Sequence, residues 1–301
     1  MITEGMRMTE TVVGMRPEGF RLPDTTHIGK VRLQVSDLGR SVEYYETVLG
    51  LRVIQRDAGR AQLGPKDEDV VLIELVEKPG ARQVSRRGLL GLYHFAVLLP
   101  DRASLGSFLV HLSEIGAYAG MSDHFVSEAL YLTDPDGLGI EVYADRPRSS
   151  WVLNDRQLAM TTKPLDADSV VASAQGKKWE GAPKGTRIGH VHFYVADISE
   201  AERFYHSALG LDKIVWSYPG ALFLSAGGYH HHVGVNTWAQ GSPVATDDDA
   251  KLLDWELELP DAASVDAAAK SIENAGFDVM READAAVTSD KWGIRLRLVS
   301  V

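Results

Sequence analysis

The stretch that decides the fold is residues 30–51, KVRLQVSDLGRSVEYYETVLGL. Its first part alternates apolar and polar side chains, which is the pattern of a strand with one buried face. The strand ends at Asp37, where the N-cap of a helix belongs, and apolar residues then recur at helical spacing as far as Gly50. A glycine at that place suits the left-handed conformation that ends many helices. The sequence therefore predicts a strand, a helix and a sharp helix end within this stretch.

Three further stretches repeat this strand-to-aspartate pattern. They are HFAVLLPD, which ends at Asp101, HVHFYVAD, which ends at Asp197, and WELELPD, which ends at Asp261. The interval from Asp37 to Asp101 equals the interval from Asp197 to Asp261. The matching pairs outside these aspartates are Tyr45 with Tyr205, Leu49-Gly50-Leu51 with Leu209-Gly210-Leu211, Pro100 with Pro260, and Gly116 with Gly276. The repeat predicts four modules in two tandem halves, and each of the four aspartates is expected to cap a helix.

Each module continues with three shorter strand candidates after its helix. In the second module the turn residues Asp-Pro-Asp-Gly at 134–137 separate the last two of them. The unit is therefore βαβββ, and the fold class is α+β. We expect an N-terminal arm at 1–26, a first domain of modules one and two at 27–146, a linker at 147–186 with a short helix near 166–175, and a second domain of modules three and four at 187–301.

The composition excludes several classes of protein. The chain has 301 residues, 45% of them apolar and 24% charged, with a formal net charge of −11 and no cysteine. The negative charge argues against binding to nucleic acid, and no apolar run approaches the ~18 residues of a membrane span. Without cysteine, a metal must be held by His, Asp or Glu. We expect a cytoplasmic protein with small-molecule partners and with no nucleic-acid or membrane partner, and we leave open a homo-oligomer built on the arm and the linker.

Four βαβββ modules with a helix that ends in Leu-Gly-Leu resemble the vicinal-oxygen-chelate superfamily of glyoxalases, bleomycin-resistance proteins and type I extradiol dioxygenases. The resemblance covers residues 27–301. Within it, His124-x5-Leu130-Tyr131-x2-Asp134-Pro135-x-Gly137-x3-Glu141 resembles the extradiol ring-cleavage signature, from which only Ser122 departs. The strings GLYHFAVLLPDR, SEALYLTDPDG, GIEVYADRPR and SAGGYHHHVGVN are most similar to the two-domain catechol-2,3-dioxygenases of bacteria.

The resemblance implies two cupped mixed-sheet barrels, each built from two modules, which is the glyoxalase and extradiol dioxygenase fold. It also implies a metal held by the first strands of two paired modules and by the last strand of one of them. The matching first-strand residues are Lys30, His94, His190 and Asp254, and the matching last-strand residues are Glu141 and, through a repeated glycine and isoleucine, Arg295.

The pairing of the modules decides whether these residues form a site. Pairing module one with two places Lys30 among the ligands, and pairing three with four leaves His190 without a second imidazole. Only the crossed pairing, two with three and one with four, unites His94, His190 and Glu141. Two imidazoles and one carboxylate leave adjacent positions of a non-haem Fe(II) ion open. We therefore expect crossed pairing, as in the hydroquinone dioxygenases of this superfamily, and a salt-bridged filler in the other barrel.

Ring cleavage also requires an acid and a base near the metal, for which imidazole is suited. The run Tyr-His-His-His-Val-Gly-Val-Asn at 229–236 is expected on the last strand of module three. The resemblance makes His231 the acid/base, although the choice among the three histidines stays open. It assigns His124 and Tyr131 to hydrogen bonds with a substrate oxygen. The alternatives are that the histidine run is a solvated edge, that Tyr131 packs and that His124 caps a turn.

The resemblance therefore implies an extradiol dioxygenase that opens catechol or a substituted catechol with O2 to a 2-hydroxymuconic semialdehyde type of product. Its metal would be Fe(II), with Mn(II) as the alternative, and its role would be aromatic catabolism. Three alternatives stay open: a hydroquinone-cleaving dioxygenase, a glyoxalase-type metal-dependent isomerase and a metal-free binding or resistance protein. The isomerase needs a second carboxylate ligand, for which the sequence offers only Glu74 in module one.

Overall fold

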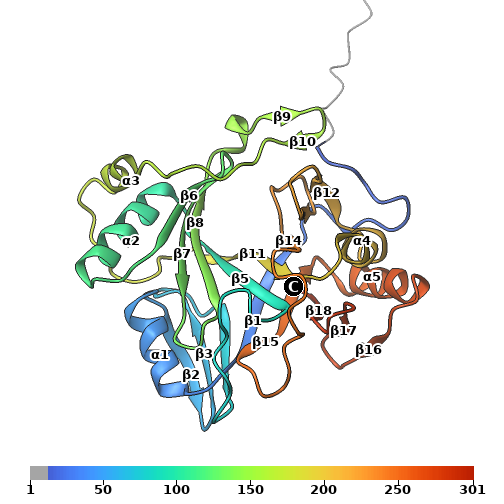
Figure 1. The fold of residues 1–301 in the computed structure, drawn as a ribbon, viewed down its shortest axis with the longest axis horizontal. Coiled ribbons are helices and arrows are strands. Elements are labelled where there is room, and N and C mark those ends of the chain that lie inside the picture. Colours follow the sequence, from blue (N-terminus) through green and yellow to red (C-terminus); the bar gives the residue numbers. More distant parts are fainter. Residues whose placement is uncertain (1–12) are drawn as a thin grey trace, which may run out of the picture.

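The computed structural model describes residues 13–301 and contains two eight-stranded mixed sheets (Figure 1). The strands of the first, which we call the histidine sheet, are in order β12 (Asp212–Val215), β13 (Ala221–Ser225), β14 (Val233–Asn236), β11 (Arg187–Tyr194), β5 (Gly91–Leu98), β8 (Gly139–Asp145), β7 (Ser127–Thr133) and β6 (Gly120–Asp123). Those of the second, the ion-pair sheet, are β16 (Val279–Arg281), β17 (Ala286–Ser289), β18 (Arg295–Ser300), β15 (Lys251–Leu259), β1 (His27–Val35), β4 (Ile73–Glu77), β3 (Arg60–Gly64) and β2 (Arg52–Asp57).

Both sheets contain strands from both halves of the chain. β5 of module two pairs antiparallel with β11 of module three, and β1 of module one pairs antiparallel with β15 of module four. In Figure 1 the modules of the first half, coloured blue to green, lie mainly on the left and those of the second half, orange to red, on the right, while the blue arm extends to the right. Each sheet therefore crosses between the halves. The expected α+β fold of four βαβββ modules is confirmed, and the strand order is that of the crossed pairing.

The helix of each module begins at an aspartate, as the sequence predicts. The helices are α1 (Leu38–Thr47), α2 (Arg102–Glu114), α4 (Ile198–Glu202), which continues as the π-helical turn η2 (Arg203–Ala208), and α5 (Ala262–Asn274). Asp37, Asp101, Asp197 and Asp261 accept hydrogen bonds from backbone N–H groups in the first turns of these helices. These groups have no partner inside a helix, so the caps stabilise the helix starts. Gly50, which follows α1, has the predicted left-handed conformation with a φ of 68°.

Two tyrosine–aspartate hydrogen bonds connect the sheets within the halves. Tyr45 of α1 donates to Asp134 in the turn before β8, and Tyr205 of η2 donates to Asp290 in the turn before β18, over 3.1 and 3.0 Å. In each pair the tyrosine belongs to a module of one sheet and the aspartate to a module of the other. Burial raises the pKa of Asp134 and of Asp290 to about 6. The repeat of these tyrosines in the sequence therefore reflects a repeated contact between tandem modules.

The arm packs on module three, where Leu22 is buried and Arg21 forms an ion pair with Asp212. Residues 1–12 of the predicted arm lie outside the described residues. The linker contains η1 (Arg148–Ser150), β9 (Leu153–Asn154), β10 (Gln157–Leu158) and α3 (Ala167–Ser173), and α3 is the short helix predicted near 166–175. The domain boundaries stay predictions, because each sheet draws on both halves. No helix within residues 13–301 is long and apolar enough to cross a membrane.

Candidate metal centre

His94, Glu141 and His190 lie together at the centre of the histidine sheet. Ala96 of β5 is paired with Glu141 of β8 on one side and with His190 of β11 on the other. These residues form a row across three strands, and His94 lies two positions from Ala96 on the same face. One nitrogen of each imidazole and one carboxylate oxygen all lie within 4.8 Å of one another. Ala96 contributes only a methyl group to the middle of this row.

The contacts of the three side chains fit a metal ion. His94 Nε2 and His190 Nε2 lie 3.0 and 3.3 Å from Glu141 Oε2, and within residues 13–301 no lysine or arginine pairs with this carboxylate. Nδ1 of His94 and Nδ1 of His190 are buried without a hydrogen-bond partner among the described residues, and the close contact of His94 Nε2 with Glu141 lacks hydrogen-bond geometry. Buried carboxylates and imidazole nitrogens without partners are costly, and a divalent cation between them removes that cost. The three residues are therefore a candidate metal site.

The protonation states are those that metal binding requires. Burial acts to raise the pKa of Glu141, but His190 and His94 hold it well below its usual value. Burial lowers the pKa of His190 to about 4, although Glu141 acts in the opposite direction. At neutral pH the carboxylate is therefore ionised and the His190 imidazole is neutral, so both present electron pairs to a cation.

A cavity of about 780 Å³ opens onto this centre. His94 and Glu141 line it, together with the predicted catalytic residues His124, Tyr131 and His231. Cavities of roughly 300–1,000 Å³ hold drug-sized ligands, so an aromatic diol has room beside the metal site.

His124 and Tyr131 form a hydrogen-bonded pair next to the centre. His124 lies in the turn between β6 and β7, with Nε2 2.7 Å from the Tyr131 hydroxyl and Nδ1 2.6 Å from the carbonyl of Thr161. Because a carbonyl only accepts, Nδ1 of His124 carries a hydrogen and Nε2 accepts from Tyr131. The Tyr131 ring lies 5.7 Å from the ring of His94. The pair therefore faces the cavity and also contacts a residue of the metal site.

His231 is oriented by a chain of hydrogen bonds that begins at Asp145. Its ring lies 4.0 Å from the ring of His190, and its Nδ1 lies 2.7 Å from Nδ1 of His230. Nε2 of His230 lies 2.9 Å from Asp145 Oδ1. Because the carboxylate accepts from His230 Nε2–H, Nδ1 of His230 must accept from His231 Nδ1–H. This chain leaves Nε2 of His231 as a proton acceptor.

The prediction that the histidine run lies on a strand is wrong. β14 begins at Val233, and 230–232 form the bend before it. On a strand, neighbouring residues point to opposite faces, which would separate His230 from His231. The bend instead lets these two imidazoles form a hydrogen bond, while His232 lines a second, smaller pocket.

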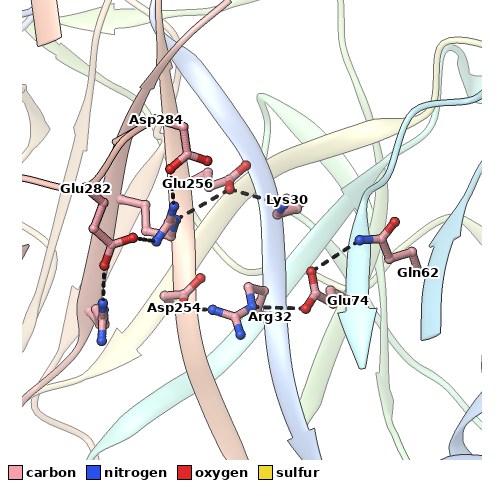
Figure 2. A network of polar contacts seen from close by, with 10 residues as sticks. Lys30, Arg32, Gln62, Glu74, Asp254, Glu256, Glu282 and Asp284 are labelled. Atoms are coloured by element: carbon pink, nitrogen blue, oxygen red, sulfur yellow. Dashed lines mark hydrogen bonds and ion pairs between the residues drawn. The ribbon is translucent and has the colours of Figure 1, made fainter. Parts of the chain in front are cut away.

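The ion-pair sheet carries charges at the corresponding positions (Figure 2). Arg32 of β1 takes the place of Ala96, because it is paired with Glu74 of β4 and with Asp254 of β15. Its guanidinium lies 3.3 Å from Glu74 and 2.6 Å from Asp254. Arg32 therefore supplies a cation in this sheet at the place where the histidine sheet has a methyl group.

The three predicted filler residues form ion pairs, but not with one another. Their partners are Glu256 for Lys30, Arg32 for Asp254, and Glu282 for Arg295. The ion-pair sheet is therefore salt-bridged as expected, although each filler residue is neutralised by a neighbour that the sequence did not mark.

The strand register corrects the match between Arg295 and Glu141. Arg297, and not Arg295, lies at the position of Glu141. The turns before β8 and β18 have the same form, because Gly137 and Gly293 both have a positive φ and donate their backbone N–H groups to the aspartates that begin these turns. Gly293 therefore corresponds to Gly137. The sequence comparison matched it instead with Gly139 at the start of β8, which shifted the alignment of the two strands by two residues.

The sequence did not mark several residues that line the cavity as functional. They are the aromatic residues Tyr93, Tyr194, Tyr218 and Trp238 and the arginines Arg86 and Arg87. Strand alternation could have indicated two functional candidates. It places Tyr194 on the same face of its strand as His190, and Asp145 on the same face of its strand as Glu141. The arginines lie in the loop between β4 and β5, and no periodic pattern marks a loop residue.

A family model described as the Glyoxalase/Bleomycin resistance protein/Dioxygenase superfamily matches residues 27–142 and 187–297. The chain belongs to this superfamily. Both matched segments contribute to the candidate metal site, since the first contains His94 and Glu141 and the second contains His190.

One sequence relative and two solved structures with a similar fold carry the names of different enzymes. A Bacillus subtilis (strain 168) protein named catechol-2,3-dioxygenase is 44% identical over 261 residues, which cover 85% of this chain and 90% of the relative. A candidate dioxygenase of Bacillus subtilis subsp. subtilis str. 168 has a similar structure, with a TM-score of 0.64 at 14% identity over 93% of this chain and 86% of that chain. Glyoxalase I from Zea mays has a TM-score of 0.54 at 17% identity, with 92% of each chain covered. At such identities the two structures show the fold alone.

Proposed function

We propose that this protein is an extradiol dioxygenase that opens the ring of catechol or a substituted catechol to a 2-hydroxymuconic semialdehyde type of product. The buried set of His94, Glu141 and His190 carries the proposal, because its three ligand atoms lie within 4.8 Å of one another beside a cavity of about 780 Å³. The 44% identity to a relative named catechol-2,3-dioxygenase supports it. The fold alone supports only membership of the superfamily, because one fold hosts several reactions.

His94, His190 and Glu141 would hold Fe(II), with Mn(II) as the alternative, because mixed imidazole and carboxylate sets accept both. The redox chemistry with O2, and the chelation of both diol oxygens, would be supplied by this metal. The residues around it bind the substrate, orient it and move protons.

His231 is the acid/base of this proposal. Asp145 and His230 keep its hydrogen on Nδ1, so that Nε2 accepts a proton from a hydroxyl of the diol. Burial holds the pKa of His231 well below its usual value, which keeps the free imidazole neutral and able to accept. The same nitrogen then returns the proton to an oxygen of the product.

His124 and Tyr131 bind a substrate oxygen in this proposal. A substrate hydroxyl passes its proton to the oxygen of Tyr131 as the Tyr131 hydrogen moves to Nε2 of His124. His124 Nε2–H then donates to the oxygen of Tyr131, and the Tyr131 hydroxyl donates to the deprotonated substrate oxygen. The pair stabilises negative charge that develops on that oxygen.

The rival functions have less support. The second carboxylate that a glyoxalase-type isomerase needs, Glu74, lies in the ion-pair sheet and pairs with Arg32. A metal-free binding protein would leave the buried carboxylate of Glu141 with imidazoles as its only ion-pair partners among the described residues. Hydroquinone cleavage is compatible with the crossed pairing. Hydroquinone is therefore included as a substrate in the experiment.

Oxygen uptake tests the proposal. The protein is reconstituted anaerobically with Fe(II), and with Mn(II) in parallel, and is then mixed with catechol, 4-methylcatechol or hydroquinone in oxygenated buffer. We expect uptake with the catechols and a yellow ring-fission product. Oxygen uptake with hydroquinone alone would show that the substrates are hydroquinones and not catechols. No uptake with any of the three compounds, by protein with verified metal content, would contradict the proposal. His231→Gln should lower kcat by about 100-fold or more, while His111→Gln, which changes a histidine outside the cavity, should not.

A further inference from the structure

The cavity carries two arginines that no described carboxylate neutralises. Arg86 and Arg87 are exposed and line the cavity. Within residues 13–301 neither forms a salt bridge, whereas Arg82 of the same loop pairs with Asp249. Apart from Glu141 at the metal site, no aspartate or glutamate of the described residues lines the cavity. The cavity therefore presents uncompensated positive charge at these arginines.

The backbone of the loop holds both arginines at the cavity. The amide of Val84 donates to the carbonyl of Asp136 over 2.8 Å, which ties the loop to the turn before β8. Arg87 has a φ of 58°, a left-handed conformation that residues other than glycine rarely adopt. Its carbonyl accepts a hydrogen bond of 2.8 Å from the hydroxyl of Ser242. An uncommon conformation fixed from a distant segment is a mark of a functional position.

An aromatic wall connects the arginines with the metal site. The ring of Tyr93 lies 4.5 Å from the ring of His94 and 4.6 Å from the ring of Tyr194. Burial raises the pKa of Tyr194 to about 12, and the positive charges of Arg87 and Arg86 oppose this rise. The same two charges act on Tyr93, so both guanidinium groups lie near this aromatic wall.

We infer that the substrate is a catechol with an anionic substituent, such as a carboxylate on a short side chain, and that Arg86 and Arg87 bind this group. The inference rests on the proposed ring cleavage. With the diol at His94 and Glu141, the cavity of about 780 Å³ leaves space for a substituent beyond the ring. A guanidinium binds a carboxylate through two parallel hydrogen bonds. In a chain with a net charge of −11, uncompensated arginines at the cavity also attract an anion that the rest of the surface repels.

The test compares an acid with its neutral methyl ester. The substrates are 3-(3,4-dihydroxyphenyl)propanoate and its methyl ester, with 3,4-dihydroxybenzoate and 3,4-dihydroxyphenylacetate as shorter acids. We expect kcat/KM from oxygen uptake to favour the acid over the ester by about 10-fold or more, as charged hydrogen bonds at a partly exposed site allow. The double variant Arg86→Gln/Arg87→Gln should bring this ratio close to one, and Arg87→Lys should retain part of it. Arg82→Gln removes the same charge from the same loop outside the cavity and should leave the ratio unchanged.

A binding measurement separates this inference from the proposed function. Quenching of tryptophan fluorescence in metal-free protein under nitrogen reports binding of the acid and of the ester without turnover. We expect tighter binding of the acid, weakened by NaCl and by the Arg86 and Arg87 substitutions. Equal binding and equal turnover of acid and ester would overturn the inference while ring cleavage stands. Arginine-dependent binding of the acid without oxygen uptake from any catechol would uphold the anion site and contradict the proposed reaction.

Discussion

The histidine sheet and the ion-pair sheet have the same strand order, yet they treat a buried carboxylate in opposite ways. In the histidine sheet Glu141 is separated from His190 by Ala96. In the ion-pair sheet the same row contains Glu74, Arg32 and Asp254. The guanidinium of Arg32 neutralises both neighbouring carboxylates, and it lies 2.6 Å from Asp254.

The comparison teaches that the side chain at the middle of a row changes how the neighbouring carboxylates are neutralised. An arginine carries the compensating charge on the chain itself. An alanine leaves the carboxylate with imidazoles only, and a buried charge of that kind requires a partner. The two sheets share one strand order, so the different charge balance comes from a few side-chain positions.

The largest effect should come from the two matched glutamates. Glu141→Gln removes a negatively charged ligand, so metal affinity and ring cleavage should both fall by more than about 100-fold, since even the partners of ligands contribute 10- to 100-fold. Glu74→Gln makes the same change at the same strand position of the ion-pair sheet, and it should leave metal content unchanged. Metal content after dialysis and titration with Fe(II) measure both variants. Equal metal loss in the two would contradict the assignment of the site to the histidine sheet.

Arg32→Met removes the central cation of the ion-pair sheet. It leaves Asp254 and Glu74 without the guanidinium that neutralises them. Burial raises the pKa of Asp254, and Arg32 acts against that rise. In the variant, Asp254 of the folded state keeps its proton at pH values at which Asp254 of the unfolded state has lost it. The free energy of unfolding therefore falls as the pH rises. We expect a loss of about 2–4 kcal/mol at pH 7 that shrinks toward pH 4.

Denaturant unfolding at several pH values measures this loss. Arg281→Met is the matched control, because Arg281 pairs with the exposed Asp266, and surface ion pairs contribute at most about 1 kcal/mol. A loss for Arg32→Met that does not depend on pH would show that its carboxylate partners are not the cause.

The smallest effect is expected from substitutions of two glycines that lie at the same strand position, one in β1 and one in β11. A Cβ on Gly189 would lie 1.8 Å from the hydroxyl oxygen of Tyr143, which is buried and bonded to Tyr229. A Cβ on Gly29 would lie 2.8 Å from a carboxylate oxygen of Glu258, a side chain that reaches solvent, and 2.9 Å from the Cβ of Glu256, so both contacts are longer than the one at Gly189. Gly189→Ala should therefore cost about 1–3 kcal/mol and Gly29→Ala less. Thermal unfolding of the two variants checks the order, and a reversed order would contradict this account of the packing.

The candidate site shows how far residue type and spacing reach. Together with the ligand positions that the resemblance implies, these two signals select His94, Glu141 and His190 as candidates, because only one pairing of modules assembles two imidazoles and a carboxylate. They do not select Arg32, because its position matters only through its neighbours on two other strands.

Spacing fails where a short motif can be matched in two ways. A glycine and an isoleucine precede Arg295 as they precede Glu141, so the sequence aligns these two residues. The conformation of Gly293 instead matches that of Gly137, the turn glycine two residues before the start of β8, and this places Arg297 opposite Glu141 in the alignment. A two-residue motif does not record whether its glycine belongs to the turn or to the strand.

The sequence by itself determined the repeat of four modules, the four aspartate caps and the residue types at the metal site. Caps and strand alternation depend on neighbours within a few residues, and a local pattern records them. Only the tertiary structure decided the row of Arg32, the chain from Asp145 through His230 to His231, and the presence of Arg86 and Arg87 at the cavity. These contacts join residues that are distant in sequence or lie in bends and loops, where direction depends on what packs around the backbone.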